Sequence, residues 1–339
     1  MDFDTFLPVL FWLLMGVSML AYVALDGYDL GVGMLLPLAR RDEDRDLMVA
    51  SIGPFWDANE TWLVLGVGLL LIAFPKAHGV ILGALYLPVA VMLLGLILRG
   101  VAFDFRVKAQ ARHKPLWNHA FFAGSLLASL SQGWMLGRYV TGLADTPAAM
   151  AFAAWVAVAL TATYVLLGAC WLVLKMEGAL QQKAVAWAKA AWPGMVLGLL
   201  LVSVATPLIS HTVRERWFSF PNVLALLPVP LMTGLCLVAL RALLNSHHVC
   251  GPDPKTSGKL CWLPLALAIG VLFMGAFGLA FSLYPYVLLD QLTVWQVASD
   301  PSSLKLILAG CAISLPAIAG YTVFVYRVFG GKTGALTYG

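Results

Sequence analysis

The sequence predicts an all-α integral membrane protein. Of its 339 residues, 61% are hydrophobic and only 11% are charged, whereas a typical soluble domain is about 25% charged. Apolar runs long enough to cross a bilayer, which takes about 20 helical residues, recur along the whole chain and are joined by short linkers. We therefore expect a single polytopic membrane domain over residues 1–339.

Nine apolar runs are long enough to be transmembrane helices. They cover residues 7–36, 56–75, 79–101, 117–142, 148–174, 191–210, 219–244, 260–287 and 304–328. The first run follows an acidic N-terminus that lacks the basic region and the cleavage site of a signal peptide. We therefore expect this run to be retained as a span.

The positions of basic residues predict how the chain is oriented. They gather in the loops after the odd-numbered runs, beginning with Arg40 after the first run and Lys114 after the third. Arg214 and Arg216, after the sixth run, depart from this pattern. Because basic loops remain in the cytoplasm, we expect the N-terminus outside and the C-terminus in the cytoplasm. These loop residues also account for the net charge of +4, so the charge does not indicate a nucleic-acid partner.

Two carboxylates, Asp26 and Asp29, lie near the inner end of the first run. An ionisable side chain in lipid costs at least about 2.5–3.5 kcal/mol, and the i, i+3 spacing places both on one helix face. They would be ordinary interfacial residues if the span ended at Leu25, but the sequence stays apolar until Arg40. Either the helix protrudes from the bilayer or its glycines bend it. In both cases we expect the pair to lie within protein and to exchange protons.

The second run opens with a motif, Phe55-Trp-Asp-Ala-Asn-Glu-Thr-Trp62, that allows two interpretations. In the structural one, Asp57 is an N-cap that forms a capping box with Glu60, and Trp56 is an interfacial anchor. In the functional one, Asp57, Glu60 and Asn59 belong to the same charged site as the acids of the first run. We favour the functional interpretation because a helix cap requires none of these neighbours.

The end of the third run carries Arg99, Asp104 and Arg106. Arg106 is explained by anchoring on the cytoplasmic side together with a local ion pair. Arg99 differs because it follows an unbroken apolar run and therefore needs a buried partner. We expect that partner to be Asp29 or Asp57.

Elsewhere the runs carry few polar side chains. The segment Ser129-Leu-Ser-Gln-Gly133 supplies hydroxyls and an amide, which we expect to hydrogen-bond across helices. All six histidines lie at run ends or in loops, whereas a haem held by histidine in a bundle needs an inward-facing one. The five cysteines form no C-x-x-C pair. We therefore expect neither a bound metal nor a His-ligated haem in this chain, although ligation by methionine remains open.

Three of these motifs together resemble subunit II of cytochrome bd-type quinol oxidases, in residues, order and spacing. The motifs are Leu25-Asp-Gly-Tyr-Asp-Leu-Gly-Val-Gly-Met34, Phe55-Trp-Asp-Ala-Asn-Glu-Thr-Trp-Leu63 and Arg99-Gly-Val-Ala-Phe-Asp-Phe-Arg106. A looser likeness extends to Ser131–Gly133, Phe281–Tyr286 and Phe329–Lys332. Asp290 and Val287–Leu289 stand where the family often carries a proline-containing segment. This difference suggests the cyanide-insensitive branch of the family.

The resemblance implies one subunit of a terminal oxidase in the bacterial cytoplasmic (inner) membrane, which oxidises quinol and reduces oxygen to water. In this family two b-type haems and one d-type haem belong to the partner, subunit I, so no cofactor is expected here beyond the structural quinone of some members. A small single-helix subunit and membrane lipid are further expected partners. The family fold implies two four-helix bundles, residues 1–142 and 148–287, plus a peripheral ninth helix at 304–328.

By position in the motifs, the family's proton-route carboxylate corresponds to Asp57. The acids that line the same intake correspond to Asp26, Asp29 and Asp104. We expect supporting or tuning roles for their polar and aromatic neighbours, Arg99, Glu60, Asn59 and Trp56.

Two other functions remain open at this point. One is a proton- or cation-coupled secondary transporter, which would require polar groups near the membrane midplane and broken helices in both halves of the chain. The second half carries almost no charge within its apolar runs, which argues against a transporter. The other is a purely structural membrane subunit, whose acids would be caps and anchors.

Overall fold

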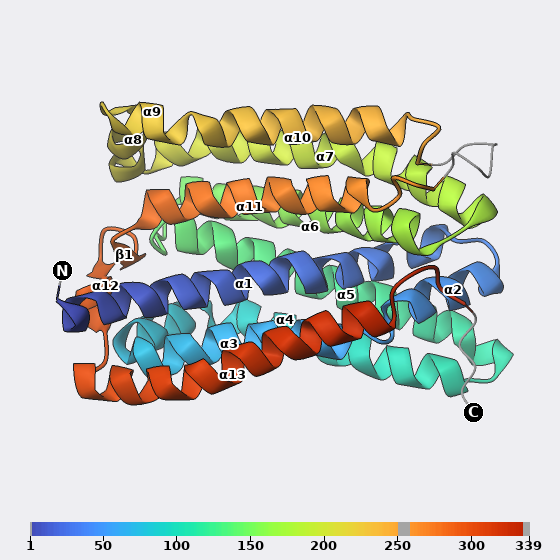
Figure 1. Ribbon diagram of the computed structural model, residues 1–339, viewed down its shortest axis with the longest axis horizontal. Helices are drawn as coiled ribbons and strands as arrows, with labels where there is room; N and C mark the ends of the chain where they lie inside the picture. The colour runs from blue at the N-terminus through green and yellow to red at the C-terminus, as the bar shows by residue number, and fades with distance from the viewer. Residues whose placement is uncertain (1, 250–257, 335–339) are drawn as a thin grey trace.

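The computed structural model describes residues 2–249 and 258–334, and almost all of them are helical. The long helices run side by side along the longest axis of the molecule (Figure 1). They are α1 (Phe3–Leu35), α3 (Trp56–Ala73), α4 (Pro75–Lys108), α5 (Lys114–Val140), α6 (Pro147–Lys175), α7 (Gly178–Ile209), α10 (Pro228–Leu244), α11 (Leu263–Leu283) and α13 (Pro301–Val328).

Short elements cover the two ends of this array (Figure 1). The end on the right of the figure carries η1 (Leu36–Leu38), α2 (Asp42–Ile52) and η2 (Ala111–His113). The other end carries α8 (His211–Phe218), α9 (Asn222–Leu226), α12 (Val294–Val297) and an antiparallel hairpin of β1 (Tyr286–Leu288) and β2 (Leu292–Thr293). Helix α1 begins at the left end of the array, and α13 runs from the left end toward the right but stops before reaching it (Figure 1).

Eight helices of the described chain are long and apolar enough to cross a membrane. They include every long helix except α5, with α9 and α10 counted together as one span. Helix α5 has 27 residues and packs against α4 and α6, but serines, amides and charged residues lower its hydropathy. The structure thus confirms the membrane class and the helical fold, while a ninth span through α5 remains a prediction.

Helix α1 extends without interruption for 33 residues, which corresponds to about 50 Å. This is longer than the hydrocarbon core of a bilayer, about 30 Å. Helix α1 is continuous through Gly27, Gly31 and Gly33, and the two expected arrangements, a helix that protrudes and a helix bent by its glycines, remain predictions. Asp26 and Asp29 lie in the last third of this helix, where neighbouring helices surround them.

Glycines allow α1 to pack closely on α6. A Cβ atom added to Gly31 would lie 1.9 Å from the carbonyl oxygen of Tyr164, and one added to Gly168 would lie 2.3 Å from the carbonyl carbon of Gly31. Such backbone contact is typical of membrane helices with small residues at their interface. It buries the inner third of α1 against protein, which is where the two acids lie.

Candidate functional site

A cluster of charged side chains lies where α1, α3 and α4 meet. Asp26 and Asp29 of α1 are fully buried, and Arg99 of α4 is 2% exposed. Asn59 and Glu60 join them from the first two turns of α3. The tertiary structure thus brings together acids, an amide and a guanidinium that lie far apart in the sequence.

Arg99 bridges two carboxylates. Its Nη1 atom donates to Oδ1 of Asp26 over 2.6 Å, and its Nη2 atom donates to Oε1 of Glu60. The expectation that Arg99 pairs with Asp29 or Asp57 was therefore wrong. The reason is geometric: Arg99 meets α1 one turn before Asp29, at Asp26.

Asn59 holds the second buried acid. Its Nδ2 atom donates to Oδ2 of Asp29 over 2.8 Å and to the hydroxyl of Tyr28 over 2.9 Å. Oδ2 of Asp26 and Oδ1 of Asp29 accept no hydrogen bond from the described residues. Each of these two carboxyl groups thus keeps one oxygen that can take up a proton.

The charges in the cluster do not balance. Three carboxyl groups, those of Asp26, Asp29 and Glu60, lie in the cluster with one guanidinium, that of Arg99, which pairs with Asp26 and Glu60 but not with Asp29. Burying uncompensated negative charge costs free energy, and a proton bound to one carboxyl group removes part of that cost. The arrangement is therefore chemically suited to hold and release protons.

Asp57 and Asp104 lie outside this buried cluster, and both are exposed on the surface of the chain. Helix α3 begins at Trp56 with Phe55 as the N-cap residue, which makes no side-chain cap bond. The capping-box interpretation of Asp57 and Glu60 was therefore wrong, because the helix begins two residues earlier than a cap at Asp57 requires. Asp57 lies one helical turn before Glu60, between the buried cluster and the surface.

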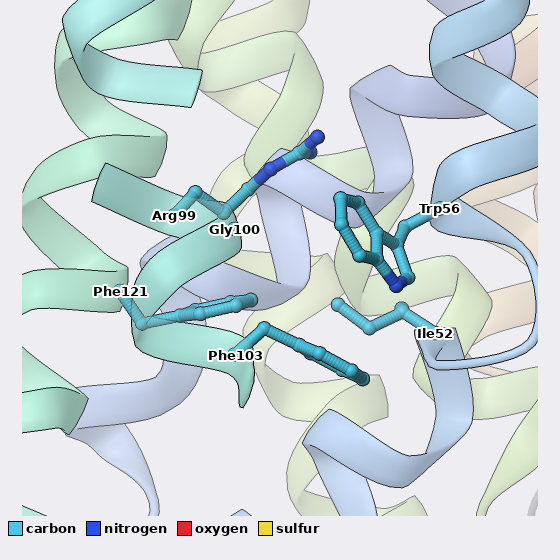
Figure 2. Close-up of a pocket in the computed structure, with 6 residues that line it drawn as sticks. All are labelled: Ile52, Trp56, Arg99, Gly100, Phe103 and Phe121. Atoms are coloured by element: carbon cyan, nitrogen blue, oxygen red, sulfur yellow. The ribbon is translucent and has the colours of Figure 1, made fainter. Parts of the chain in front are cut away.

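A shallow pocket beside Arg99 is lined mainly by apolar side chains and is too narrow to hold a water molecule. Figure 2 shows the Arg99 side chain above the pocket, with Phe103 and Phe121 below it and Trp56 beside it. The guanidinium carbon lies 5.9 Å from the centre of the Trp56 ring, within the range of a cation–π interaction. Trp56 thus covers Arg99 at the junction of α3 and α4.

Sequence reasoning missed the tyrosines around the cluster. A phenol in an apolar helix resembles an interfacial anchor, and the one available signal was that Tyr28 directly precedes Asp29. The polar segment Ser129–Gly133 of α5 was expected to hydrogen-bond across helices. Gln132 donates through Nε2 to the hydroxyl of Tyr22 and accepts through Oε1 from Tyr164, both over 2.7 Å. This confirms hydrogen bonding across helices for Gln132.

A second charged cluster fixes α2 at the same end of the molecule. Arg41 and Lys183 bond to the two carboxylate oxygens of Asp44, over 2.7 and 2.8 Å. The hydrogen bond from Arg41, and to a lesser extent the one from Lys183, lowers the pKa of Asp44 below its usual value. Arg106 pairs with Asp46 of α2 over 2.7 Å. These contacts place α2 against α4 and α7, next to the buried acids.

The residues of this chain do not fit a haem held by histidine. All six histidines are exposed or only partly buried and lie at helix ends or in loops. In the part of the chain that the structure describes, no group of three or more His, Cys, Asp or Glu side chains could hold a metal ion. The polar chemistry of the site thus consists of carboxyl, amide, guanidinium and phenol groups.

The fold and the site define a polytopic helical membrane protein with a charged cluster buried at one end of its helices. A family model described as cytochrome bd terminal oxidase subunit II matches residues 7–329, and the chain belongs to this family.

Individual relatives agree with this assignment. The chain is 27% identical to cytochrome bd ubiquinol oxidase subunit 2 of Bacillus subtilis, over 94% of this chain and 95% of the relative. It is 35% identical to cytochrome bd-I ubiquinol oxidase subunit 2 of Escherichia coli K12 over 139 residues, 40% of this chain and 37% of the relative. Its fold matches a chain of the bd oxidase from Geobacillus thermodenitrificans with a TM-score of 0.72, at 16% identity, over 95% of this chain and 98% of that one.

Proposed function

We propose that this chain supports a haem-bearing partner subunit in a bacterial terminal oxidase that oxidises quinol and reduces oxygen to water. The match to the subunit II family over residues 7–329 carries this proposal. A member of this family is part of a haem-containing oxidoreductase complex in a membrane, and it therefore works with a partner subunit. The names of its relatives specify ubiquinol, which supports a quinol as the electron donor.

The haems, two of b type and one of d type, are assigned by this proposal to the partner. The positions of the histidines support the assignment, because none of them projects between the long helices. The visible absorbance of the purified complex and of this chain alone tests it. Haem bands in the complex only are expected, and haem bands in the isolated chain would contradict the assignment.

The chemical role that we propose for this chain is proton conduction from the cytoplasm. In this proposal Asp57 and Asp104 collect protons at the surface, and Glu60, Asp26 and Asp29 carry them inward. The main support is the cluster of three carboxyl groups with one guanidinium, which pairs with two of them. Arg99 would stabilise the buried carboxylates and limit how many protons these carboxyl groups bind.

The arrangement in the membrane completes the proposal. The N-terminus would lie outside and the C-terminus in the cytoplasm, with nine spans in two four-helix bundles, residues 1–142 and 148–287, and a ninth helix at 304–328. A small single-helix subunit, lipid and a structural quinone are further proposed partners. Membership of the cyanide-insensitive branch remains a prediction.

The experiment that tests proton conduction neutralises the aspartates one at a time in the assembled oxidase. Turnover and haem content are measured for Asp26→Asn, Asp29→Asn, Asp57→Asn and Asp104→Asn. Slow oxygen reduction at normal haem content is expected of a proton route. A purely structural subunit would keep full turnover in all four variants.

A secondary transporter is the less favoured function. Such a protein needs polar groups within both halves of the bundle. Among the described residues after α5, Lys175 is the only buried side chain that carries a charge. Lys175 lies at the end of α6, far from the middle of the span.

A further inference from the structure

We propose that Tyr28, Asn59 and Tyr326 form a closed ring of hydrogen bonds that holds the Asn59 amide on Asp29. In this arrangement Tyr326, on the last helix α13, is a positioning residue for proton transfer. The inference rests on the proposed role of Asp29 in the proton route. It adds that uncharged side chains control the orientation of the Asn59 amide that bonds to Asp29.

The ring is made of three contacts between three helices. Nδ2 of Asn59 on α3 donates to the hydroxyl of Tyr28 on α1 over 2.9 Å. The hydroxyl of Tyr326 on α13 donates to Oδ1 of Asn59 over 3.2 Å. The two tyrosine hydroxyls are hydrogen-bonded to each other. The second hydrogen of Nδ2 points to Oδ2 of Asp29, which at 2.8 Å is much nearer than the Leu25 carbonyl oxygen at 3.4 Å.

When Asp29 is ionised, the chemistry of the groups fixes the direction of every bond in the ring. An ionised carboxylate only accepts hydrogen bonds, so the Asn59 atom that faces Asp29 is the amide nitrogen. The carbonyl oxygen of Asn59 then faces Tyr326 and takes its only hydroxyl proton. Tyr28 must therefore donate to Tyr326, and each member both donates and accepts within the ring.

Aromatic side chains pack against this ring, in which Tyr28 and Asn59 are buried and Tyr326 is partly buried. The Tyr28 ring stacks on Trp171 with centroids 4.1 Å apart, and Phe55 lies 4.8 Å from the ring of Tyr326. Tyr28, Phe55 and Trp171 are each at most 2% exposed. Hydrogen bonds in such surroundings are stronger than in water and reinforce one another. The Asn59 amide is thus held in one orientation as long as Tyr326 stays in place.

Helix α13 depends on polar contacts for its position. Of its 28 residues only Leu304, Cys311 and Val325 are buried. It is tied to α3 and α1 by Tyr326 and by the hydrogen bond from Trp62 Nε1 to the Thr322 hydroxyl, at 3.3 Å. A displacement of α13 would therefore open the ring and release the amide from Asp29.

Loss of the ring should change the pH dependence of turnover, because ionised Asp29 would lose an oriented donor. The titratable and charged groups that surround Asp29 are Asp26 and Tyr28 on α1, Glu60 on α3, Arg99 on α4 and Tyr326 on α13. A Tyr326→Phe substitution removes one hydroxyl and leaves all of these charges in place.

The test compares three variants of the assembled oxidase: Tyr326→Phe, Tyr28→Phe and the control Tyr321→Phe. Tyr321 lies on the same helix, is 53% exposed and is outside the ring. Oxygen reduction is measured from pH 5 to pH 9 together with haem content. For Tyr326→Phe we expect turnover reduced about threefold and the acid limb of the profile moved to higher pH by roughly half a unit. Tyr28→Phe should behave similarly, and Tyr321→Phe should match the wild type.

Asp29→Asn is measured in parallel, so that two failures can be told apart. If Asp29→Asn is slow but Tyr326→Phe and Tyr28→Phe keep the wild-type pH profile, the positioning role is overturned while the proton route stands. If Asp29→Asn has full turnover, the proposed proton route fails and the positioning role fails with it. Should Tyr326→Phe fail to assemble, the profile of Tyr28→Phe decides.

Discussion

Nη1 of Arg99 lies 2.6 Å from Oδ1 of Asp26, and both side chains are buried, although 73 residues separate them in the sequence. A buried ion pair stabilises a fold little compared with apolar packing, but removing one partner leaves an uncompensated buried charge. In this protein the guanidinium serves two carboxylates, since Glu60 shares it. The integrity of the whole acid cluster therefore depends on one cation.

Replacing this cation should impair assembly more than chemistry. For Arg99→Met we expect a loss of roughly 3–5 kcal/mol of stability, seen as a low yield of haem-containing complex. Arg99→Lys keeps the charge but cannot bond two carboxylates in the same fork geometry, and its yield should be intermediate. A normal yield for Arg99→Met would show that the acids are already neutral without Arg99.

Neutralising Asp57, the exposed acid, should impair turnover more than assembly. Asp57 is exposed and outside the buried cluster, so Asp57→Asn should leave haem content unchanged. If Asp57 delivers protons to Glu60, oxygen reduction should slow by about tenfold or more, as expected for a lost proton-transfer group. Glu43→Gln, at an exposed acid of α2, is the matched control. Wild-type turnover of Asp57→Asn at normal haem content would remove Asp57 from the route.

Close packing of α1 on α6 can be tested with two glycines of the same helix. A Cβ atom at Gly31 would overlap the backbone of α6, whereas one at Gly16 would meet nothing within 4 Å. Gly31→Ala should therefore destabilise the protein by about 1–3 kcal/mol or more and lower the thermal midpoint of the complex. Gly16→Ala should have a midpoint equal to or above that of the wild type. Equal midpoints for both variants would contradict the packing described for α1.

The contacts of Asp44 predict a pH-dependent contribution to stability. Its pKa in the folded protein is lowered, mainly by the hydrogen bond from Arg41. The contribution is therefore complete above the unfolded pKa of about 4 and is lost as the pH falls through the folded value. At pH 7, Asp44→Asn should be less stable than the wild type by roughly 1–2 kcal/mol, and the difference should shrink below pH 4.

Thermal denaturation of both proteins between pH 7 and pH 3.5 measures this difference. Glu43→Gln, at an exposed acid of the same helix, should show no comparable change with pH. A difference for Asp44→Asn that stayed constant over the whole pH range would contradict the ionic role of Asp44.

The membrane class and most helices followed from the sequence, because hydropathy reports directly which segments lipid can accept. The ends of the helices were predicted less accurately. Helix α7 begins at Gly178, well before the apolar run at 191–210, because its first turns are amphipathic and hydropathy does not detect them. The break between α9 and α10 at Leu227 was foreseeable, since Pro228 can only begin a helix there.

The members of the site followed from the sequence only in part. Buried charges are costly, so Asp26, Asp29 and Arg99 could be recognised as unusual in apolar runs. Their pairing could not, because the i, i+3 rule applies within one helix and says nothing of how α1 and α4 cross. The exposure of Asp57 and Asp104 was also beyond reach, because a position on a helix does not reveal which face its neighbours cover.

The sequence by itself determined that this chain is a membrane protein and that its buried acids need polar or charged partners. Both conclusions follow from the free-energy cost of placing charge in lipid. Only the tertiary structure decided which partners they find. Arg99 binds Asp26 and Glu60, Asn59 binds Asp29, and Tyr326 closes a ring from the far end of the chain. These pairings depend on where glycines allow the helices to approach each other. The position and angle at which two helices cross result from the packing of both helices, so the sequence of one helix alone does not determine them.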